Sequence, residues 1–242
     1  MNKTIELLNN HKSIRKFNEL LITPEEEQAI IHASMRGATA GNMMPYSIIK
    51  IRSKETLAKL ADSCDHQPFI ESAALALLYV VDNSKWHRLF ELRDIKSTYT
   101  NYEGPVISDM ILGMQDTMIA AQNAVIAAES LGIGTCYIGD ILEHNEYHRE
   151  LFNLPDYVMP ATLIVMGRFD LVPKLRDRFD QEHIVFDEVY PDIDDNFINS
   201  MYKEKEKDNP DFAKKFYDRK MNADFFREKN RSLELYIKAW QK

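Results

Sequence analysis

The sequence predicts an α+β fold, a sheet flanked by helices. Three apolar runs, at residues 46–51, 74–82 and 161–169, have the length and composition of strands. Residues 109–131 have the pattern of a long helix that is buried on most sides. Apolar faces of sheets and helices must be buried against one another. A chain of 242 residues, 45% of them apolar, can do this around a sizeable core.

A helix start precedes the first strand. Thr23 is the expected N-cap, Pro24 the first helical residue, and Glu26 the residue that completes a capping box. The helix should run towards Gly37. Residues 38–45 then read as a loop that leads into the first strand.

Two further elements follow this strand. Residues 54–62 are expected to form a short helix, and residues 74–82 (ALALLYVVD) are apolar enough for a strand covered on both faces.

The helix at 109–131 is the most informative segment. Its polar residues recur every seven positions among apolar ones, and its internal Asp116 and Glu129 argue against a membrane span. Gly132 and Gly134 are expected to end it.

The carboxyl-terminal part differs in composition from the rest. We expect a main domain at residues 1–200 and a helical extension at 201–242 that packs on the core or on a partner subunit. The extension ends in an apolar stripe with helical spacing, formed by Leu233, Tyr236, Ile237 and Trp240.

Composition and charge exclude several classes of protein. A net charge of -8 with no basic half argues against general binding to nucleic acid or to a membrane surface. Cys64 and Cys136 lack the spacing of a zinc site or a disulfide framework, and together with the absence of a signal-peptide pattern they favour the cytoplasm. His144 and His148 are spaced i, i+4 but lack the HExxH pattern, so we expect a surface helix and no metal site.

The segment HKSIRKF, residues 11–17, concentrates hydrogen-bond donors and positive charge in an acidic chain. It could be a solvated basic turn. However, Ser, Lys and Arg together suit a phosphate group, because they provide neutral and charge-assisted hydrogen bonds. Arg176 and Arg178 could complete such a site.

The glycines of LGIGTCYIGD, residues 131–140, do not form a dinucleotide-binding fingerprint, because their spacing is wrong and they follow a helix. They could cap that helix, or let the backbone lie close to a flat ligand. No catalytic triad or acid-base pair stands out.

Several segments together resemble the FMN-dependent nitroreductase family, particularly its longer NADPH-dependent nitroreductase and flavin reductase type. The resemblance extends from about residue 8 to 190. It rests on HKSIRKF, GATAGNMMPYSIIKI, DHQPFIESAALALLYVVD, AAQNAVIAAESLGIGTCYIGDI and RDRFDQEHIVFDEVY. It implies a three-layer α/β/α sandwich with a mainly antiparallel sheet, in an interlocked homodimer.

The resemblance also implies which residues bind FMN. The phosphate, ribityl chain and pyrimidine edge would be held by His11, Lys12, Ser13 and Arg15, with Arg176 and Arg178 completing the phosphate clamp. Thr39, Ala40 and Asn42 would reach the flavin from the other subunit. Gln67 would face the ring system, and Tyr137, Ile138 and Gly139 would lie along one ring face.

The implied activity is transfer of a hydride from NADPH or NADH through FMN to a nitroaromatic, quinone or flavin acceptor by a ping-pong mechanism. The chemistry is carried by FMN, so no catalytic residue is expected. One alternative is another flavin reaction, such as reductive dehalogenation or flavin fragmentation, under a lid at residues 86–105. Others are a flavin-binding protein without turnover and an acidic interaction protein that binds no flavin.

The chain departs from the usual family pattern near the ring. Ala38 replaces Pro, Met44 replaces Gln, Tyr46 replaces Trp, and Asp140 replaces a second Gly. In the second basic cluster, Arg-Asp-Arg at residues 176–178 replaces Lys-Pro-Arg.

Overall fold

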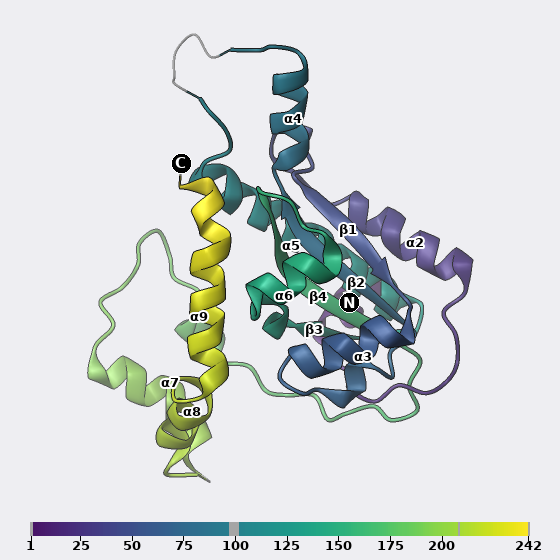
Figure 1. Ribbon diagram of the computed structural model, residues 1–242. Helices are drawn as coiled ribbons and strands as arrows, with labels where there is room; N and C mark the ends of the chain where they lie inside the picture. Colours follow the sequence, from purple (N-terminus) through teal and green to yellow (C-terminus); the bar gives the residue numbers. More distant parts are fainter. Residues whose placement is uncertain (1, 97–101, 208, 242) are drawn as a thin grey trace. The chain divides into compact units, whose positions relative to one another are not determined.

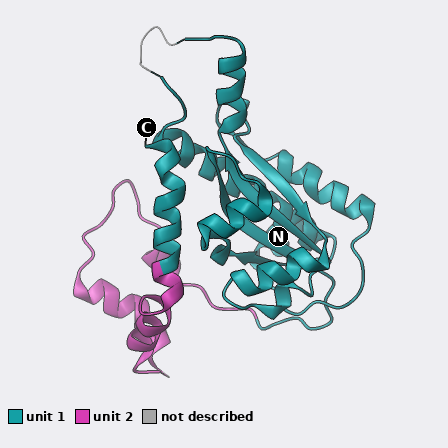
Figure 2. Cartoon of the chain, viewed as in Figure 1, with its two compact units in different colours: residues 1–174, 228–242 teal, residues 175–227 magenta. Residues whose placement is uncertain are grey.

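The computed structural model describes residues 2–96, 102–207 and 209–241. The chain divides into two compact units, coloured teal and magenta in Figure 2. Unit 1 comprises residues 1–174 and 228–242, and unit 2 comprises residues 175–227.

Unit 1 is built on a four-stranded sheet with the order β1-β2-β4-β3, in which every neighbouring pair is antiparallel (Figure 1). The strands are β1 (Tyr46–Ile51), β2 (Leu75–Asp82), β3 (Gly134–Ile138) and β4 (Val158–Gly167).

Helices surround this sheet and also form the regular part of unit 2. Those of unit 1 are α1 (Lys3–Asn9), α2 (Pro24–Met35), α3 (Lys54–Ser63), α4 (Ser84–Leu92), α5 (Ile107–Ser130) and α6 (Asn145–Phe152). Unit 2 contains α7 (Asp195–Lys207) and α8 (Phe212–Lys220), and α9 (Asp224–Ile237) begins in unit 2 and continues in unit 1. The short 3-10 helices are η1 (Ala40–Asn42), η2 (Pro68–Ile70), η3 (Gly139–Leu142), η4 (Gln181–His183) and η5 (Lys238–Trp240).

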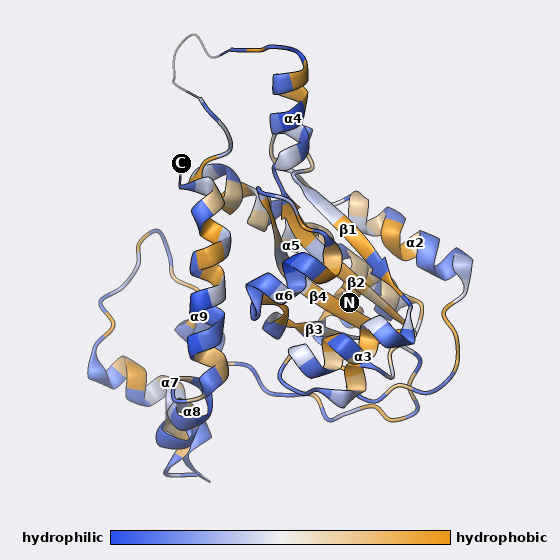
Figure 3. Cartoon of the chain, viewed as in Figure 1, coloured by the Kyte–Doolittle hydropathy of each residue, from blue (hydrophilic) through white to orange (hydrophobic). Residues whose placement is uncertain are grey.

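The sheet is covered on both faces, which gives the three layers that the resemblance implies. Leu78 of β2 points to the layer that contains Leu57 of α3. Its neighbour Leu77 points to the opposite layer, with Ala124 of α5 and Ile30 of α2. Figure 3 shows the matching hydropathy, with orange strands in the centre and helices of mixed colour around them. Alternate side chains of a strand point to opposite faces, so a strand in the middle layer must be apolar throughout.

Local signals predicted the first elements correctly. The hydroxyl of Thr23 accepts a hydrogen bond from the backbone N–H of Glu26 at 3.2 Å, and the Glu26 carboxylate accepts one from the N–H of Thr23 at 3.0 Å. β1 has the predicted bounds, and β2 is buried along its whole length.

Two expectations need correction. Gly134 does not end α5 but begins β3, a strand too short to be recognised inside a glycine-rich segment; Gly132, with φ +69°, follows the helix end. One face of α5 is also exposed in the single chain, where Ile111 and Leu112 are 50% and 47% accessible. The core of the chain covers only the opposite side of this helix.

The terminal apolar stripe docks on the chain's own core. Tyr236 and Trp240 are each 1% exposed and pack with Val81 and Met159. The indole N–H of Trp240 donates a hydrogen bond to the side-chain oxygen of Asn83 at 3.0 Å.

Within the described ranges, no helix combines the length and the apolar character needed to cross a membrane. The segment proposed as a lid, residues 86–105, begins in α4, and its residues 97–101 lie outside the described part of the chain.

Trp240→Ala should lower the free energy of unfolding by roughly 3–5 kcal/mol, because it leaves a large cavity and removes the partner of Asn83. Denaturant unfolding followed by circular dichroism measures this loss. The matched control is Trp86→Ala, which removes the other, only partly buried tryptophan and should cost less. Equal losses for the two variants would contradict the docking of the terminal stripe.

Candidate functional site

The segment at residues 11–17 lies along the outer edge of β3. Ser13 forms a parallel bridge with Thr135, and the N–H of Ile14 donates to the carbonyl of Thr135 at 2.8 Å. Ser13 and Arg15 also lie against the thiol of Cys136. Cys136 is buried in the sheet, and this burial raises the pKa of its thiol although Ser13 and Arg15 act to lower it.

Two glycines allow this close approach. A Cβ atom at Gly134 would lie 2.7 Å from side-chain atoms of Ile14 and Phe169, and one at Gly167 would lie 2.8 Å from the ring of Phe17. No other residue fits at either position without displacing the basic segment.

His11 is oriented by a carboxylate of α5. Its Nδ1 lies 2.6 Å from Oε1 of Glu129, and the same oxygen accepts a hydrogen bond from the Thr135 hydroxyl at 3.3 Å. Glu129 therefore connects the basic segment with β3.

The cations of this segment are available to an external anion. Within the described ranges, Lys12, Arg15 and Lys16 form no ion pair with an acid, whereas bases such as Arg168 and Arg231 do. Lys12 lines a small hollow of about 160 Å³ beside Gly134.

Gln67 lies at the start of η2 and contacts η3. Its amide nitrogen donates one hydrogen bond to the carbonyl of Cys64 at 2.8 Å and another to the carboxylate of Asp140 at 2.9 Å.

The last residues of β3 lead directly into η3, which Gln67 contacts. The Tyr137 hydroxyl donates to the Gln122 side chain at 3.1 Å, and burial raises the pKa of this tyrosine. Ile138 is in the core, and a Cβ atom at Gly139 would meet open space. The backbone at Gly139 is thus accessible to a flat ligand.

The loop at residues 39–42 is held elsewhere on α5. The Thr39 hydroxyl and the Ala40 N–H both donate to the buried carboxylate of Asp116, at 2.5 and 3.0 Å, whereas Asn42 is exposed with φ +55°. Thirteen residues separate Asp116 from Glu129, which is about 20 Å along a helix. A larger cavity of about 490 Å³ lies next to this loop, between α2, β1 and α4, and none of the predicted site residues lines it.

The structure therefore connects the basic segment with β3, and Gln67 with the turn that follows β3. Ser13 and Arg15 lie against Thr135 and Cys136 of β3, which directly precede Tyr137, Ile138 and Gly139, and Gln67 contacts Asp140, which follows them. The loop at 39–42 is distant in the same chain. Arg176 and Arg178 belong to unit 2, and their part in a phosphate clamp stays a prediction.

Three charged residues beside this site have little signal in the sequence. Glu129 was noticeable as an acid in an apolar helix, but its pairing with His11 was not. Asp140 was noticed only as a replacement of glycine. Nothing in the sequence around Lys229 indicates its contact with Asp140.

Comparison with known proteins identifies the fold and its family. The family model described as the nitroreductase family matches residues 8–168. The chain belongs to the nitroreductase family. Its sequence is similar to an FMN reductase (NADPH) of Bacillus subtilis, with 30% identity over 203 residues that cover 83% of this chain and 80% of the relative. An NADPH-flavin oxidoreductase of Vibrio harveyi is also 30% identical, with the same coverage of the two chains.

Solved structures extend the similarity of this nitroreductase to nearly the whole chain. The structure of B. megaterium NfrA2 superposes with a TM-score of 0.83, 26% identity and coverage of 98% of both chains. The NADPH:FMN oxidoreductase from Vibrio harveyi complexed with NAD+ gives a TM-score of 0.75 and 28% identity, with coverage of 86% of this chain and 87% of that one.

The nitroreductase buries an unusual acid behind η3. Glu143 is 3% exposed, and burial, reinforced by Asp140, raises the pKa of its carboxyl to about 7 although Lys229 opposes the shift.

His148 is also buried, so the expectation of a surface helix is wrong for it. Burial lowers its pKa to about 4, so the ring is neutral near pH 7. Its Nδ1 lies 2.7 Å from the carbonyl of Glu143, which only accepts, so Nδ1 carries the proton. Nε2 then accepts from the Ser63 hydroxyl at 2.9 Å. Both ring nitrogens are therefore used within the fold.

Glu143→Gln should stabilise the nitroreductase increasingly as the pH rises. The folded chain keeps a proton on Glu143 that the unfolded chain releases between about pH 4.5 and 7, so ionisation in this window destabilises the parent. As the pH rises from about 4 to about 8, the free energy of unfolding of the variant should increase by roughly 2–3 kcal/mol relative to that of the parent.

Denaturant unfolding at several pH values measures this difference. Glu150→Gln is the control, since Glu150 is exposed and should show no such gain. A constant difference between Glu143→Gln and the parent would contradict the raised pKa.

Proposed function

We propose that the chain is an FMN-dependent oxidoreductase that uses NADPH or NADH to reduce nitroaromatic, quinone or flavin acceptors. The observation that carries the proposal is that the basic segment lies against β3, which leads directly into the open backbone at Gly139 and to the oriented amide of Gln67. The named relatives, which are NADPH-dependent flavin reductases, support the choice of cofactor and donor.

The residues of the basic segment suit the FMN phosphate. A phosphate monoester carries about -1.5 to -2 charge and takes several charge-assisted hydrogen bonds. Lys12 and Arg15 each carry a positive charge that can pair with the phosphate, and Glu129 holds His11 in place. Because no acid in the described part of the chain pairs with Lys12 or Arg15, their charges stay free to bind an anion.

The end of β3 suits the flat ring of FMN. Gly139 offers backbone without a side chain, Tyr137 is restrained by Gln122, and Gln67 is fixed beside them. When bound, FMN supplies the chemistry of accepting a hydride and passing electrons on. The protein residues then have to bind and orient the cofactor and to stabilise its negative charge, and no separate acid-base pair is required.

We also propose that the active form is a homodimer in the cytoplasm. The exposed apolar face of α5 is the candidate interface; its residues include Ile107, Ile111, Leu112, Met118 and Ile119. Contiguous apolar faces of this kind usually mark interaction surfaces. A dimer would also explain the distance between the loop at 39–42 and the basic segment, because the loop of one subunit could serve the flavin of the other.

The visible spectrum of the purified protein, followed by anaerobic addition of NADPH or NADH, tests the proposal. We expect a flavin band that one of the two donors bleaches and that a nitroaromatic or quinone acceptor restores. A flavin band that neither donor bleaches would favour flavin binding without turnover. Failure to bind added FMN would contradict the proposal altogether.

Arg15→Ala should weaken FMN binding by about tenfold to a hundredfold, through loss of a charge-assisted hydrogen bond of roughly 1.5–3 kcal/mol. Quenching of flavin fluorescence measures the dissociation constant. Arg36→Ala is the matched control, because Arg36 is exposed at the end of α2. Unchanged affinity in Arg15→Ala would remove Arg15 from the site, and the same test applies to Arg178→Ala.

Ile111→Asp should convert the dimer to a species of 28.2 kDa, because a charge on the exposed face of α5 opposes its burial. Light scattering after gel filtration measures the mass, and FMN affinity should fall with it. Leu21→Asp, at a position that is 79% exposed and lies outside α5 in the sequence, is the control. Retention of the dimer in Ile111→Asp would exclude this face as the interface.

A further inference from the structure

The amide of Gln67 has only one orientation available to it. The side-chain nitrogen of Gln67 has two partners, the Cys64 carbonyl and the Asp140 carboxylate, and both can only accept a hydrogen bond. Each therefore requires an N–H, and the two hydrogens of the amide are both committed. The carbonyl oxygen of Gln67 is what the side chain can still offer to a ligand.

Asp140 is itself held by a residue of the carboxyl-terminal helix. Nζ of Lys229 lies 3.0 Å from Oδ1 of Asp140, while Oδ2 of Asp140 accepts from Gln67. The Lys229 nitrogen also lies 3.6 Å from the carboxylate of Glu143. The side chains of Lys229 and Asp140 are each 24% exposed and that of Glu143 is 4% exposed, so solvent screens these pairs only in part.

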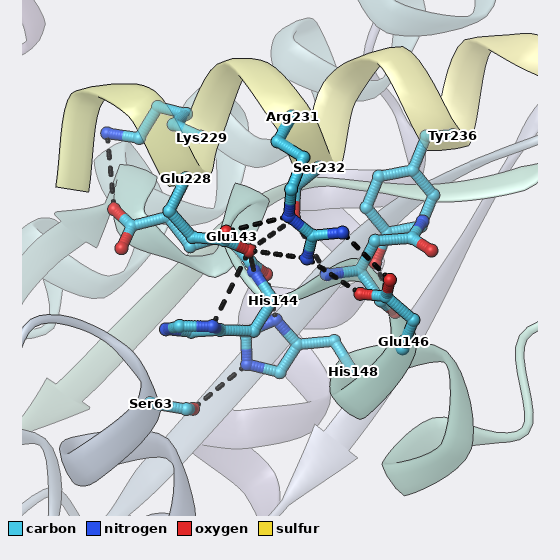
Figure 4. Close-up of polar contacts among 11 residues, drawn as sticks. Ser63, Glu143, His144, Glu146, His148, Glu228, Lys229, Arg231, Ser232 and Tyr236 are labelled. Carbon is cyan, nitrogen blue, oxygen red and sulfur yellow. Dashed lines mark hydrogen bonds and ion pairs between the residues drawn. The ribbon is translucent and has the colours of Figure 1, made fainter. Parts of the chain in front are cut away.

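Lys229 is placed by a polar network between α9 and the start of α6 (Figure 4). Arg231 binds both carboxylate oxygens of Glu146 at 2.8 Å and also reaches Glu228 at 2.8 Å. The buried hydroxyl of Ser232 accepts from the N–H of Asn145 at 2.7 Å. These contacts fix the turn of α9 that carries Lys229.

Removal of the lysine would leave the Asp140 carboxylate beside the buried Glu143 without the cation that now lies near both. Asp140 already disfavours ionisation of Glu143 and so contributes to the raised pKa of that acid. Without its charge-assisted contact to Lys229, the Asp140 carboxylate would gain solvation by turning towards solvent, and Gln67 would then lose one of its acceptors.

We propose that Lys229 is a positioning residue that, through Asp140, holds the Gln67 amide with its carbonyl oxygen towards the flavin site, as an acceptor for an N–H of the ligand. The proposal rests on the proposed function for the identity of the ligand. It gives the carboxyl-terminal helix a role in the site that the sequence did not suggest. It also gives a role to Asp140, which stands where the family often has glycine.

The side-chain amide signals of Gln67 in ¹⁵N-labelled protein provide a direct test, and Gln67→Leu identifies them by their loss. In Lys229→Met we expect these signals to move towards those of a solvated glutamine and hydrogen exchange to become about tenfold faster, as for loss of one hydrogen bond. Lys229→Arg should retain the parent signals. Lys238→Met, which removes an exposed lysine at the start of η5, directly after α9, is the matched control.

A double-mutant cycle tests whether Lys229 acts through Asp140. Asp140→Leu should free the amide as Lys229→Met does, and the double variant should show no larger effect than Asp140→Leu alone. Additive effects, or parent-like Gln67 signals in Lys229→Met, would overturn the proposal. If Lys229→Met does not fold, Lys229→Met with Glu143→Gln removes the unpaired buried acid and permits the same measurement.

FMN affinity separates this proposal from the proposed function. We expect Lys229→Met to weaken FMN binding by about tenfold, through a displaced acceptor, and Lys238→Met to leave it unchanged. If the parent binds FMN but Lys229→Met binds it equally well, the positioning role fails while the proposed function stands. If the parent binds no FMN, the proposed function fails, and the Gln67 signals still decide whether Lys229 holds the amide.

Discussion

Burial of β2 and β4 on both faces is the constraint on which the rest of the structure depends. Every residue of these two central strands is buried. Such strands require an apolar layer on each side, which α3 and α6 form on one face and α2 and α5 form on the other. With both faces covered, the free edge of β3 is where residues 11–17 add to the sheet, and Gly134 and Gly167 provide the necessary space.

The position of the basic segment connects packing with electrostatics. Glu129 projects from the helix that covers the sheet and orients His11, while Lys12 and Arg15 keep charges that no acid in the described part of the chain neutralises. The helix thus fixes the geometry of the site without cancelling its charge. The same helix leaves an apolar face uncovered in a single chain, so the requirements of burial lead from the fold to the proposed dimer.

The carboxyl-terminal helix adds a second level of organisation. Tyr236 and Trp240 anchor it by apolar burial, and Arg231 and Ser232 anchor it to the start of α6. Just before these anchors in α9, Lys229 reaches the turn after β3, where it meets Asp140. The carboxyl-terminal helix is in this way coupled to the turn at which Gln67 and Asp140 meet.

The sequence by itself determined the elements that have local signals. The capping box at Thr23, the bounds of β1 and the burial of β2 follow from residues within a few positions of one another, and motif order indicated the family. Only the tertiary structure decided that Gly134 begins a strand, that Trp240 docks on its own core, and that Lys229 reaches Asp140 across 89 residues of sequence. The reason is physical: capping and periodicity act between neighbours in sequence, whereas ion pairs and strand edges depend on which distant segments the packed core brings together.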